Sequence, residues 1–440
     1  MNPQVRESEK PERRNYREEF KDCLSYIDSY WDKITKVQHE DDETSRSREI
    51  GLPRPFLVPN TDRFPNMFYW DSYFMVQGIL GTDRQQLALD TVENFAYLFE
   101  RFRIIPNVSS FDFLHRSQPP FFSSLILDTY KAMPNKDKEW LAKYIAIAKD
   151  EYKNVWTNDD DITNKGLMGN YNHRVEGFLL SRYGDRDSDD ASPSEAESGW
   201  DYTTRFASRI DQFLPIELNS YLFKYEQDFA EAAAILGDEE EKNVWVANAE
   251  KRKEEINRLM WNEEKGFFYD FDYVHKTQSE FLSLAGFIPM WAGVATDGQA
   301  KRMVQKLASF ETELGLTVTA KESLPAVPDL TNIPPAFRIT IERLLKPKQW
   351  DYLQIWPPLE YMTVMGLLRY GLVDDAKRIM EKSVKSQANI FRKHGTFYEK
   401  MDGVTGDITS NFDYPNQSGF GWTNAVFSKY IDILEEMESS

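Results

Sequence analysis

Apolar residues recur at intervals of three to four positions along most of the chain, which is the spacing of one face of an α-helix. Within residues 16–37, for example, Phe20, Ile27, Trp31 and Ile34 fall on such a face. The same pattern predicts further helices at residues 71–81, 83–102, 120–133, 136–156, 216–236, 239–261, 279–294, 297–310, 352–370, 373–386 and 422–435. Asn135 is available to cap the helix that starts at 136, and Gly237 ends the helix that starts near 216.

Strand signals are short and few: GFFYDFD at 266–272 and GTFYEKMD at 395–402. The helices follow one another in consecutive pairs, joined by alternating short and long connections, which predicts an all-α fold, an α/α toroid with an inner and an outer ring. An α-solenoid would also pair its helices, but no repeat of about 34–47 residues is visible. No linker rich in Pro, Gly or Ser divides the chain, so we expect one domain over 1–440, with 1–15 a poorly ordered tail.

Two long polar connections, 40–63 and 181–198, interrupt the helical pattern. Loops longer than about 12–15 residues in a compact domain are usually functional lids or disordered. The second connection, SRYGDRDSDDASPSEAES, is either a disordered insert or the rim of a pocket. Its position directly before Trp200 and Asp201 favours the rim.

Composition limits the partners and the compartment. The net charge of −19 would repel phosphate backbones and anionic lipids, so we expect no nucleic acid and no membrane partner. A single cysteine, Cys23, excludes an internal disulfide and fits a reducing compartment. The charged N-terminal stretch has no apolar h-region, and no apolar run of about 18 residues occurs, so we expect a cytoplasmic protein. We also expect a monomer. No HExxH, Gly-rich phosphate loop or GxSxG is present.

Three Trp-Asp dipeptides occur in distant stretches of the chain: Trp70-Asp71, Trp200-Asp201 and Trp350-Asp351. An indole offers a flat apolar face to the C–H faces of a sugar ring, and a carboxylate accepts hydrogen bonds from its hydroxyl groups. A fourth pair, Trp31-Asp32, lies in an ordinary amphipathic helix, so the dipeptide alone is weak evidence. The neighbours of the other three predict that distant segments converge on one polar pocket with aromatic walls.

These stretches resemble, in order and spacing, the signatures of glycoside hydrolase family 37, the trehalases, from about residue 63 to 423. RFPNMFYWDSYF is similar to the first signature of the family, IPNVSSFDFLHRSQPPFF to its RSQPPFF segment, and HRVEG to its Arg-Pro-Glu segment. ESGWDYTTRF resembles the acid motif, KQWDYLQIWPP the second signature, YEKMD the base motif and SGFGWTN the C-terminal segment. The resemblance implies an (α/α)6 toroid that hydrolyses α,α-trehalose, a small disaccharide, to two glucose molecules with inversion. It also implies neither a metal nor an organic cofactor.

By this resemblance Asp201 is the general acid and Glu399 the general base, a pair that inverting enzymes hold about 6.5–9.5 Å apart. Asp201 follows Gly199 and Trp200, a predicted turn that would expose its side chain beside an indole. Such a neighbour raises the pKa of a carboxyl group, as a general acid requires. The resemblance implies that substrate is contacted by Arg63, Trp70, Asp71, Asn107, Arg116, Ser117, Gln118, Arg174, Glu176, Gly199 and Asp413. For the arginines the alternative is a surface salt bridge, and Trp350, Trp356 and Trp422 are either core or pocket wall.

Departures from the family pattern leave the exact substrate open. Asn66 and Asp413 stand where the family has glutamate, Leu353 stands where it has proline, and the Gly-rich lid is absent. The catalytic motifs match better than the lid, so glycosidase chemistry is a firmer prediction than the disaccharide. One alternative is a related toroidal inverting α-glycosidase that acts on another small glucoside or mannoside, such as glucosylglycerate. Another is a non-catalytic sugar-binding toroid, which the presence of both Asp201 and Glu399 disfavours.

Overall fold

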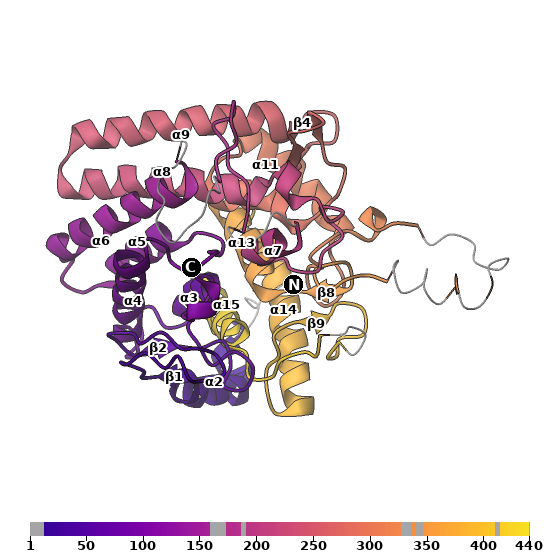
Figure 1. The fold of residues 1–440 in the computed structure, drawn as a ribbon. Coiled ribbons are helices and arrows are strands. Elements are labelled where there is room, and N and C mark those ends of the chain that lie inside the picture. The colour runs from indigo at the N-terminus through magenta and orange to yellow at the C-terminus, as the bar shows by residue number, and fades with distance from the viewer. Residues whose placement is uncertain are drawn as a thin grey trace, which may run out of the picture.

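The computed structural model describes residues 13–158, 173–185, 191–326, 334, 337–338, 346–409 and 414–439. Figure 1 shows a chain made mainly of helices that surround a common centre. In chain order the helices of this part are α1 (Tyr16–Glu19), α2 (Lys21–Ile34), α3 (Tyr69–Gln77), α4 (Gln86–Phe102), α5 (Phe122–Ala132), α6 (Lys138–Glu151), α7 (Ala191–Glu197), α8 (Ile216–Leu236), α9 (Glu239–Met260), α10 (Ile288–Ala292), α11 (Asp297–Met303), α13 (Pro357–Arg369), α14 (Val373–His394) and α15 (Gly421–Ser439).

The strands are only two residues long. They are β1 (Thr35–Lys36), β2 (Phe56–Leu57), β3 (Phe213–Leu214), β4 (Trp261–Asn262), β5 (Phe267–Phe268), β6 (Phe271–Asp272), β7 (Thr277–Gln278), β8 (Gln354–Ile355) and β9 (Met401–Asp402). They form small antiparallel ribbons, β1 with β2, β4 with β5, β8 with β9, and β3, β6 and β7 together. The β8–β9 ribbon pairs Gln354 with Asp402, which joins two segments that lie far apart in the sequence.

Six helices form an inner ring, because each packs on the next in the order α3, α5, α8, α10, α13, α15, and α15 packs back on α3. A helix enclosed on all sides is apolar around its whole circumference. Accordingly every residue of α3 is buried, as are most residues of α5, α13 and the first two turns of α15.

The second layer is amphipathic. Helices α2, α4, α6, α9 and α14 pack on the outside of the ring, and α11 packs on β5. In α14 the buried positions Ala376, Ile379, Met380 and Ser383 recur at helical spacing, while the acidic and basic residues between them face solvent. The fold is therefore an (α/α)6 toroid, which confirms the fold class predicted from the sequence.

The ring closes where α15 meets α3, and two glycines allow the close approach. A Cβ added to Gly78, directly after α3, would lie 2.6 Å from Cα of Ala425 in α15. A Cβ added to Gly421, at the start of α15, would overlap Sδ of Met75. Any side chain at these positions would push apart the first and last inner helices.

Several predicted boundaries are wrong. Asp137, not Asn135, caps α6, since its side chain accepts the N–H groups of Glu139 and Trp140. That helix ends at Glu151 and continues as a π-helical turn, Tyr152–Trp156. Gly237 ends α8 in the left-handed conformation, with φ of 89°, as predicted. The region 279–294 is helical only as a 3-10 turn, Leu284–Phe287, followed by α10.

Two further segments differ from the prediction. The helix expected at 352–370 starts at Pro357 because β8 precedes it. The connection 181–198 contains the short helix α7, while residues 186–190 of that connection lie outside the described part. Most of the expected N-terminal tail lies outside it too, although Asn15 caps α1. Among the described helices, none is long and apolar enough to cross a membrane.

Candidate active site

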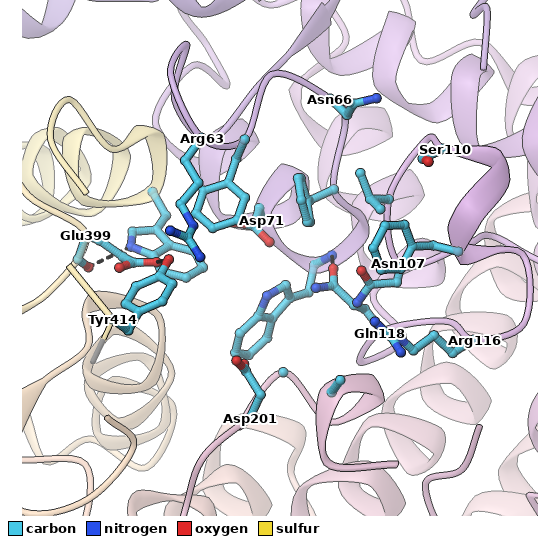
Figure 2. A pocket seen from close by; sticks show the side chains of 18 of the residues that line it. Arg63, Asn66, Asp71, Asn107, Ser110, Arg116, Gln118, Asp201, Glu399 and Tyr414 are labelled. Carbon is cyan, nitrogen blue, oxygen red and sulfur yellow. Dashed lines mark hydrogen bonds between the residues drawn. The ribbon is translucent and has the colours of Figure 1, made fainter. Parts of the chain in front are cut away.

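A cavity of about 650 Å³ lies at the end of the toroid where the inner helices begin. Its wall comes from the segments that lead into α3, α5, α8, α13 and α15, so five distant parts of the chain converge there. Figure 2 shows Asp71, Asp201 and Glu399 among its labelled side chains, each from a different segment. Its polar and charged lining residues are Arg46, Ser47, Arg63, Asn66, Asp71, Asn107, Ser110, Asp112, Arg116, Gln118, Asp201, Tyr202, Gln349, Glu399 and Tyr414.

Four buried tryptophans belong both to the hydrophobic core and to the wall of the cavity: Trp70, Trp350, Trp356 and Trp422. The rings of Trp350 and Trp356 stack at 3.7 Å between centroids with an interplanar angle of 7°. Trp70 packs against both Trp350 and Trp422, at 5.8 Å and 5.9 Å. All four line the cavity, and none is more than 3% exposed. The choice between core and pocket wall therefore resolves as both, because each indole packs with one side and faces the cavity with another.

Asp201 lies at a tight turn against this wall. Gly199 has φ of 74°, and a Cβ added there would lie 2.8 Å from Cζ2 of Trp70, so the turn needs glycine both for its backbone and for space. The side-chain amide of Gln349 donates to Oδ2 of Asp201 at 2.9 Å and to its carbonyl oxygen at 3.0 Å. Burial, and next the charge of Glu399, raise the pKa of Asp201 to about 6.

The turn is anchored by Glu197, whose carboxylate is fully buried. It accepts the backbone N–H of Ser117 at 2.9 Å and that of Gly184 at 2.7 Å, and it lies 2.9 Å from Nε2 of His173. These contacts tie three separate segments to the end of α7, four positions before Asp201. The carboxylate of Glu197 thus fixes the position of the turn that carries Asp201 relative to the segment that leads into α5.

Glu399 is held from two sides. Nζ of Lys400 lies 3.0 Å from Oε2, and the hydroxyl of Tyr414 donates to Oε1 at 3.0 Å. The ammonium group itself lies between two aromatic rings, 4.7 Å from the centroid of Trp356 and 4.5 Å from that of Tyr414. Cζ of Arg63 lies over the ring of the same tyrosine, 4.8 Å from its centroid.

The pKa of Glu399 is raised by its burial, while Lys400, Tyr414 and Arg63 each oppose that rise. The pKa of Asp71, in the first turn of α3, is raised by burial and then by the charges of Glu399 and Asp201. Three carboxyl groups therefore interact across one cavity, and among the described residues only Glu399 of the three has a cation in direct contact. This arrangement favours the ionised form at Glu399 over the other two.

Seven of the predicted binding residues line the cavity together with Asp201 and Glu399: Arg63, Trp70, Asp71, Asn107, Arg116, Gln118 and Gly199. The amide oxygen of Gln118 accepts the N–H of Trp70 at 3.1 Å, which orients its NH₂ group. Arg116 stacks on Phe113 and pairs with Asp185 at 3.1 Å.

Three other predicted residues are not among those that line the cavity in the described part of the chain. Ser117 is fully buried, and its hydroxyl donates to the carbonyl of Ile105 at 2.7 Å. Nε of Arg174 donates to the carbonyl of Phe178, and Glu176 is exposed. Asp413 lies outside the described residues.

The third Trp-Asp dipeptide does not follow the expected pattern. Oδ1 of Asp351 accepts the backbone N–H of Thr204 at 2.9 Å, and Oδ2 accepts that of Lys348 at 2.8 Å. Its carboxylate is fully buried and fastens the segment after Asp201 to the segment before Trp350, so it does not line the cavity. The three indoles do converge, whereas only two of the three carboxylates face the cavity.

Sequence reasoning missed three residues that shape the site: Gln349, Lys400 and Tyr414. Each lies within or next to a stretch that carries the resemblance, and that position is the signal available in the sequence. Their roles depend on contacts to Asp201 and Glu399 that no local pattern encodes.

A helical toroid with buried carboxyl groups that line one tryptophan-walled cavity defines a glycoside hydrolase. The family model described as Trehalase matches residues 1–198 and 190–437. The chain belongs to the trehalase family.

Solved structures support the same fold. Neutral trehalase Nth1 from Saccharomyces cerevisiae is 25% identical, with a TM-score of 0.69, over 95% of this chain and 80% of that one. An uncharacterised conserved protein from Thermus thermophilus is 16% identical, with a TM-score of 0.64, over 93% of this chain and 99% of that one. The GH63 mannosylglycerate hydrolase of the same organism, in complex with glucose, is 15% identical, with a TM-score of 0.62 and the same coverage.

Proposed function

We propose that the protein hydrolyses α,α-trehalose to two glucose molecules with inversion, with Asp201 as general acid and Glu399 as general base. The observation that carries the proposal is that these two carboxyl groups line one cavity in contrasting surroundings. One carboxyl group lies beside indoles and an amide, and the other lies beside an ammonium group and a phenol.

The surroundings of Asp201 suit a proton donor. A pKa of about 6 keeps much of the carboxyl group protonated in weakly acidic solution, whereas an ordinary aspartate would be ionised. The amide of Gln349 holds Oδ2, which leaves Oδ1 for the glycosidic oxygen. As the bond between the anomeric carbon and that oxygen breaks, the proton of Asp201 moves to the oxygen of the leaving sugar.

The surroundings of Glu399 suit a base. Lys400 and Tyr414 both favour the carboxylate form, which takes a proton from a water molecule as its oxygen attacks the anomeric carbon. Attack from the face opposite the broken bond gives β-glucose from the glycosyl half, and the leaving half departs as α-glucose. Arg63, Trp70 and Asp71 are proposed to bind the glycosyl ring, and Asn107, Arg116, Gln118 and Gly199 to complete the pocket.

The test is the stereochemistry of the first products. Trehalose is added to the enzyme, and the anomeric protons of glucose are followed by NMR before mutarotation. We expect equal amounts of α- and β-glucose in the earliest spectra. If only α-glucose appears, the enzyme retains configuration and the assignment of Glu399 as base fails. Asp201→Asn should slow turnover by about 10²- to 10⁴-fold, whereas Asp32→Asn, the matched change at an exposed aspartate that also follows a tryptophan, should leave it unchanged.

The substrate is tested separately from the mechanism. A panel of α-glucosides that includes glucosylglycerate is run beside trehalose, since the alternative from the sequence is a related small glycoside. Faster hydrolysis of another member would replace trehalose in the proposal and leave the two carboxyl roles in place. A cytoplasmic location, which fits the single buried Cys23, belongs to the same proposal and is tested by cell fractionation.

A further inference from the structure

Tyr202 follows the proposed acid directly and also lines the cavity. It is an aromatic residue that the fold leaves 66% exposed, whereas the tryptophans of the cavity are buried. A single exposed aromatic residue is ordinary on a protein surface. Tyr202 differs because its backbone is left-handed and because it directly follows Asp201.

The backbone at Tyr202 is left-handed, with φ of 61°. Such a conformation is unfavourable for a bulky residue, so the surrounding structure must hold it. One contact does so: the N–H of Trp350 donates to the carbonyl of Tyr202 at 3.3 Å.

This conformation has a geometric result. In an extended chain, successive side chains point to opposite sides. The left-handed residue interrupts that alternation, and Asp201 and Tyr202 both line the cavity. A tyrosine therefore stands beside the group that delivers the proton.

The general acid contacts the oxygen of the leaving group, so that group lies next to Asp201 and within reach of the adjacent ring. The face of an aromatic ring packs well on the C–H face of a pyranose and has little to pack on in an acyclic polyol. We propose that Tyr202 is the stacking platform of a leaving-group subsite and selects substrates whose leaving group is a pyranose ring. This inference rests on the proposed role of Asp201 as general acid.

The experiment measures binding in the Asp201→Asn background, where turnover does not interfere. Calorimetry gives the Kd of trehalose and of 1-deoxynojirimycin, a single ring shaped like glucose, for three proteins: this background, and the same background with Tyr202→Ala or Tyr202→Phe. Alanine and phenylalanine have the same need for left-handed backbone as tyrosine, so the comparison isolates the ring.

We expect Tyr202→Ala to weaken trehalose binding by about 5- to 100-fold, the range for loss of one aromatic stacking contact. Binding of 1-deoxynojirimycin should change by less than about twofold, since it fills the glycosyl position alone. Tyr202→Phe should resemble the background for both ligands. Equal losses for both ligands, or a loss in Tyr202→Phe as large as in Tyr202→Ala, would overturn the proposal.

The two proposals fail in different ways. If the unaltered enzyme hydrolyses α-glucosides with ring leaving groups other than trehalose, the disaccharide is wrong, and the same binding pair is measured with the preferred one. If it prefers glucosylglycerol or glucosylglycerate to every disaccharide, a pyranose-selective subsite is excluded. If trehalose is hydrolysed but Tyr202→Ala binds it normally, only the platform fails.

Discussion

Replacing Lys400 with methionine tests whether the cation beside Glu399 is what allows that carboxyl group to act as a base. Lys400 is buried, its Nζ lies 3.0 Å from Oε2 of Glu399, and the same atom lies over the rings of Trp356 and Tyr414. Methionine has a similar length and fills the same apolar space, so Lys400→Met removes the charge with little change in packing.

The magnitude follows from the geometry. Removing one partner of a buried ion pair leaves the other uncompensated, at a cost of about 3–5 kcal/mol. Since about 1.4 kcal/mol corresponds to one pKa unit, the pKa of Glu399 should rise by about 2 units or more. This rise would bring its titration closer to that of Asp201. Few molecules would hold an ionised base and a protonated acid together, so the maximal rate should fall by about ten- to a hundredfold.

The assay is kcat/KM against pH, whose acidic limb reports the base of the free enzyme. The limb should move to higher pH in Lys400→Met. Tyr414→Phe, which removes only the hydrogen bond to Oε1, should move it by a smaller amount. Lys21→Met is the matched control, because it removes an exposed lysine whose ion pair spans 3.7 Å. An acidic limb that stays in place in Lys400→Met, with folding intact, would refute the reasoning.

Three further predictions concern other parts of the molecule. The basic limb of kcat/KM should lie near pH 6, because Asp201 must be protonated, and Asp201→Asn should lower kcat by about 10²- to 10⁴-fold; a limb above pH 8 would contradict this. Gly199→Ala should lose activity by displacing Trp70, whereas Gly237→Ala, equally left-handed but with open space around it, should lose only stability, as melting and activity assays would show. Burial raises the pKa of Glu360 to about 7, so its ionisation destabilises the fold as pH rises from about 4.5 to 7. Glu360→Gln should therefore gain about 2.5 kcal/mol relative to the unaltered protein between pH 5 and pH 8, seen as a growing difference in melting temperature; a constant difference would count against it.

Much of the fold could be predicted because long helices carry their own periodicity. The bounds 216–236 agree with α8, whose end is fixed by a glycine with positive φ. The boundaries that failed depend on tertiary contacts. Helix α7 consists of ASPSEAE, a sequence that reads as a loop, and it ends at Glu197, which three other segments bind. Helix α14 continues past the predicted end at 386 to His394, and Gly395 ends it.

The site was partly predictable for a similar reason. Short stretches such as SGWD and YEKMD carry the resemblance, and the residues they contain line the cavity at Asp201 and Glu399. The sequence alone could not separate the Trp-Asp pairs, since Asp351 has the same local neighbours as a cavity residue but bonds to Thr204. Nor could it show that Gln349 and Lys400 hold the two carboxyl groups, because side-chain partners depend on how distant segments meet.

Because the ring of inner helices closes where α15 packs on α3, the toroid cannot close until the C-terminal helix has been synthesised. A nascent chain that has not yet reached Gly421 lacks the helix that covers Met75 and Gly78, so the first inner helix leaves the ribosome with its partner still untranslated. Until then, the side of Trp70 that packs on Trp422 would remain exposed to solvent. Premature termination before Gly421 should therefore yield inactive, aggregation-prone fragments rather than a smaller active enzyme.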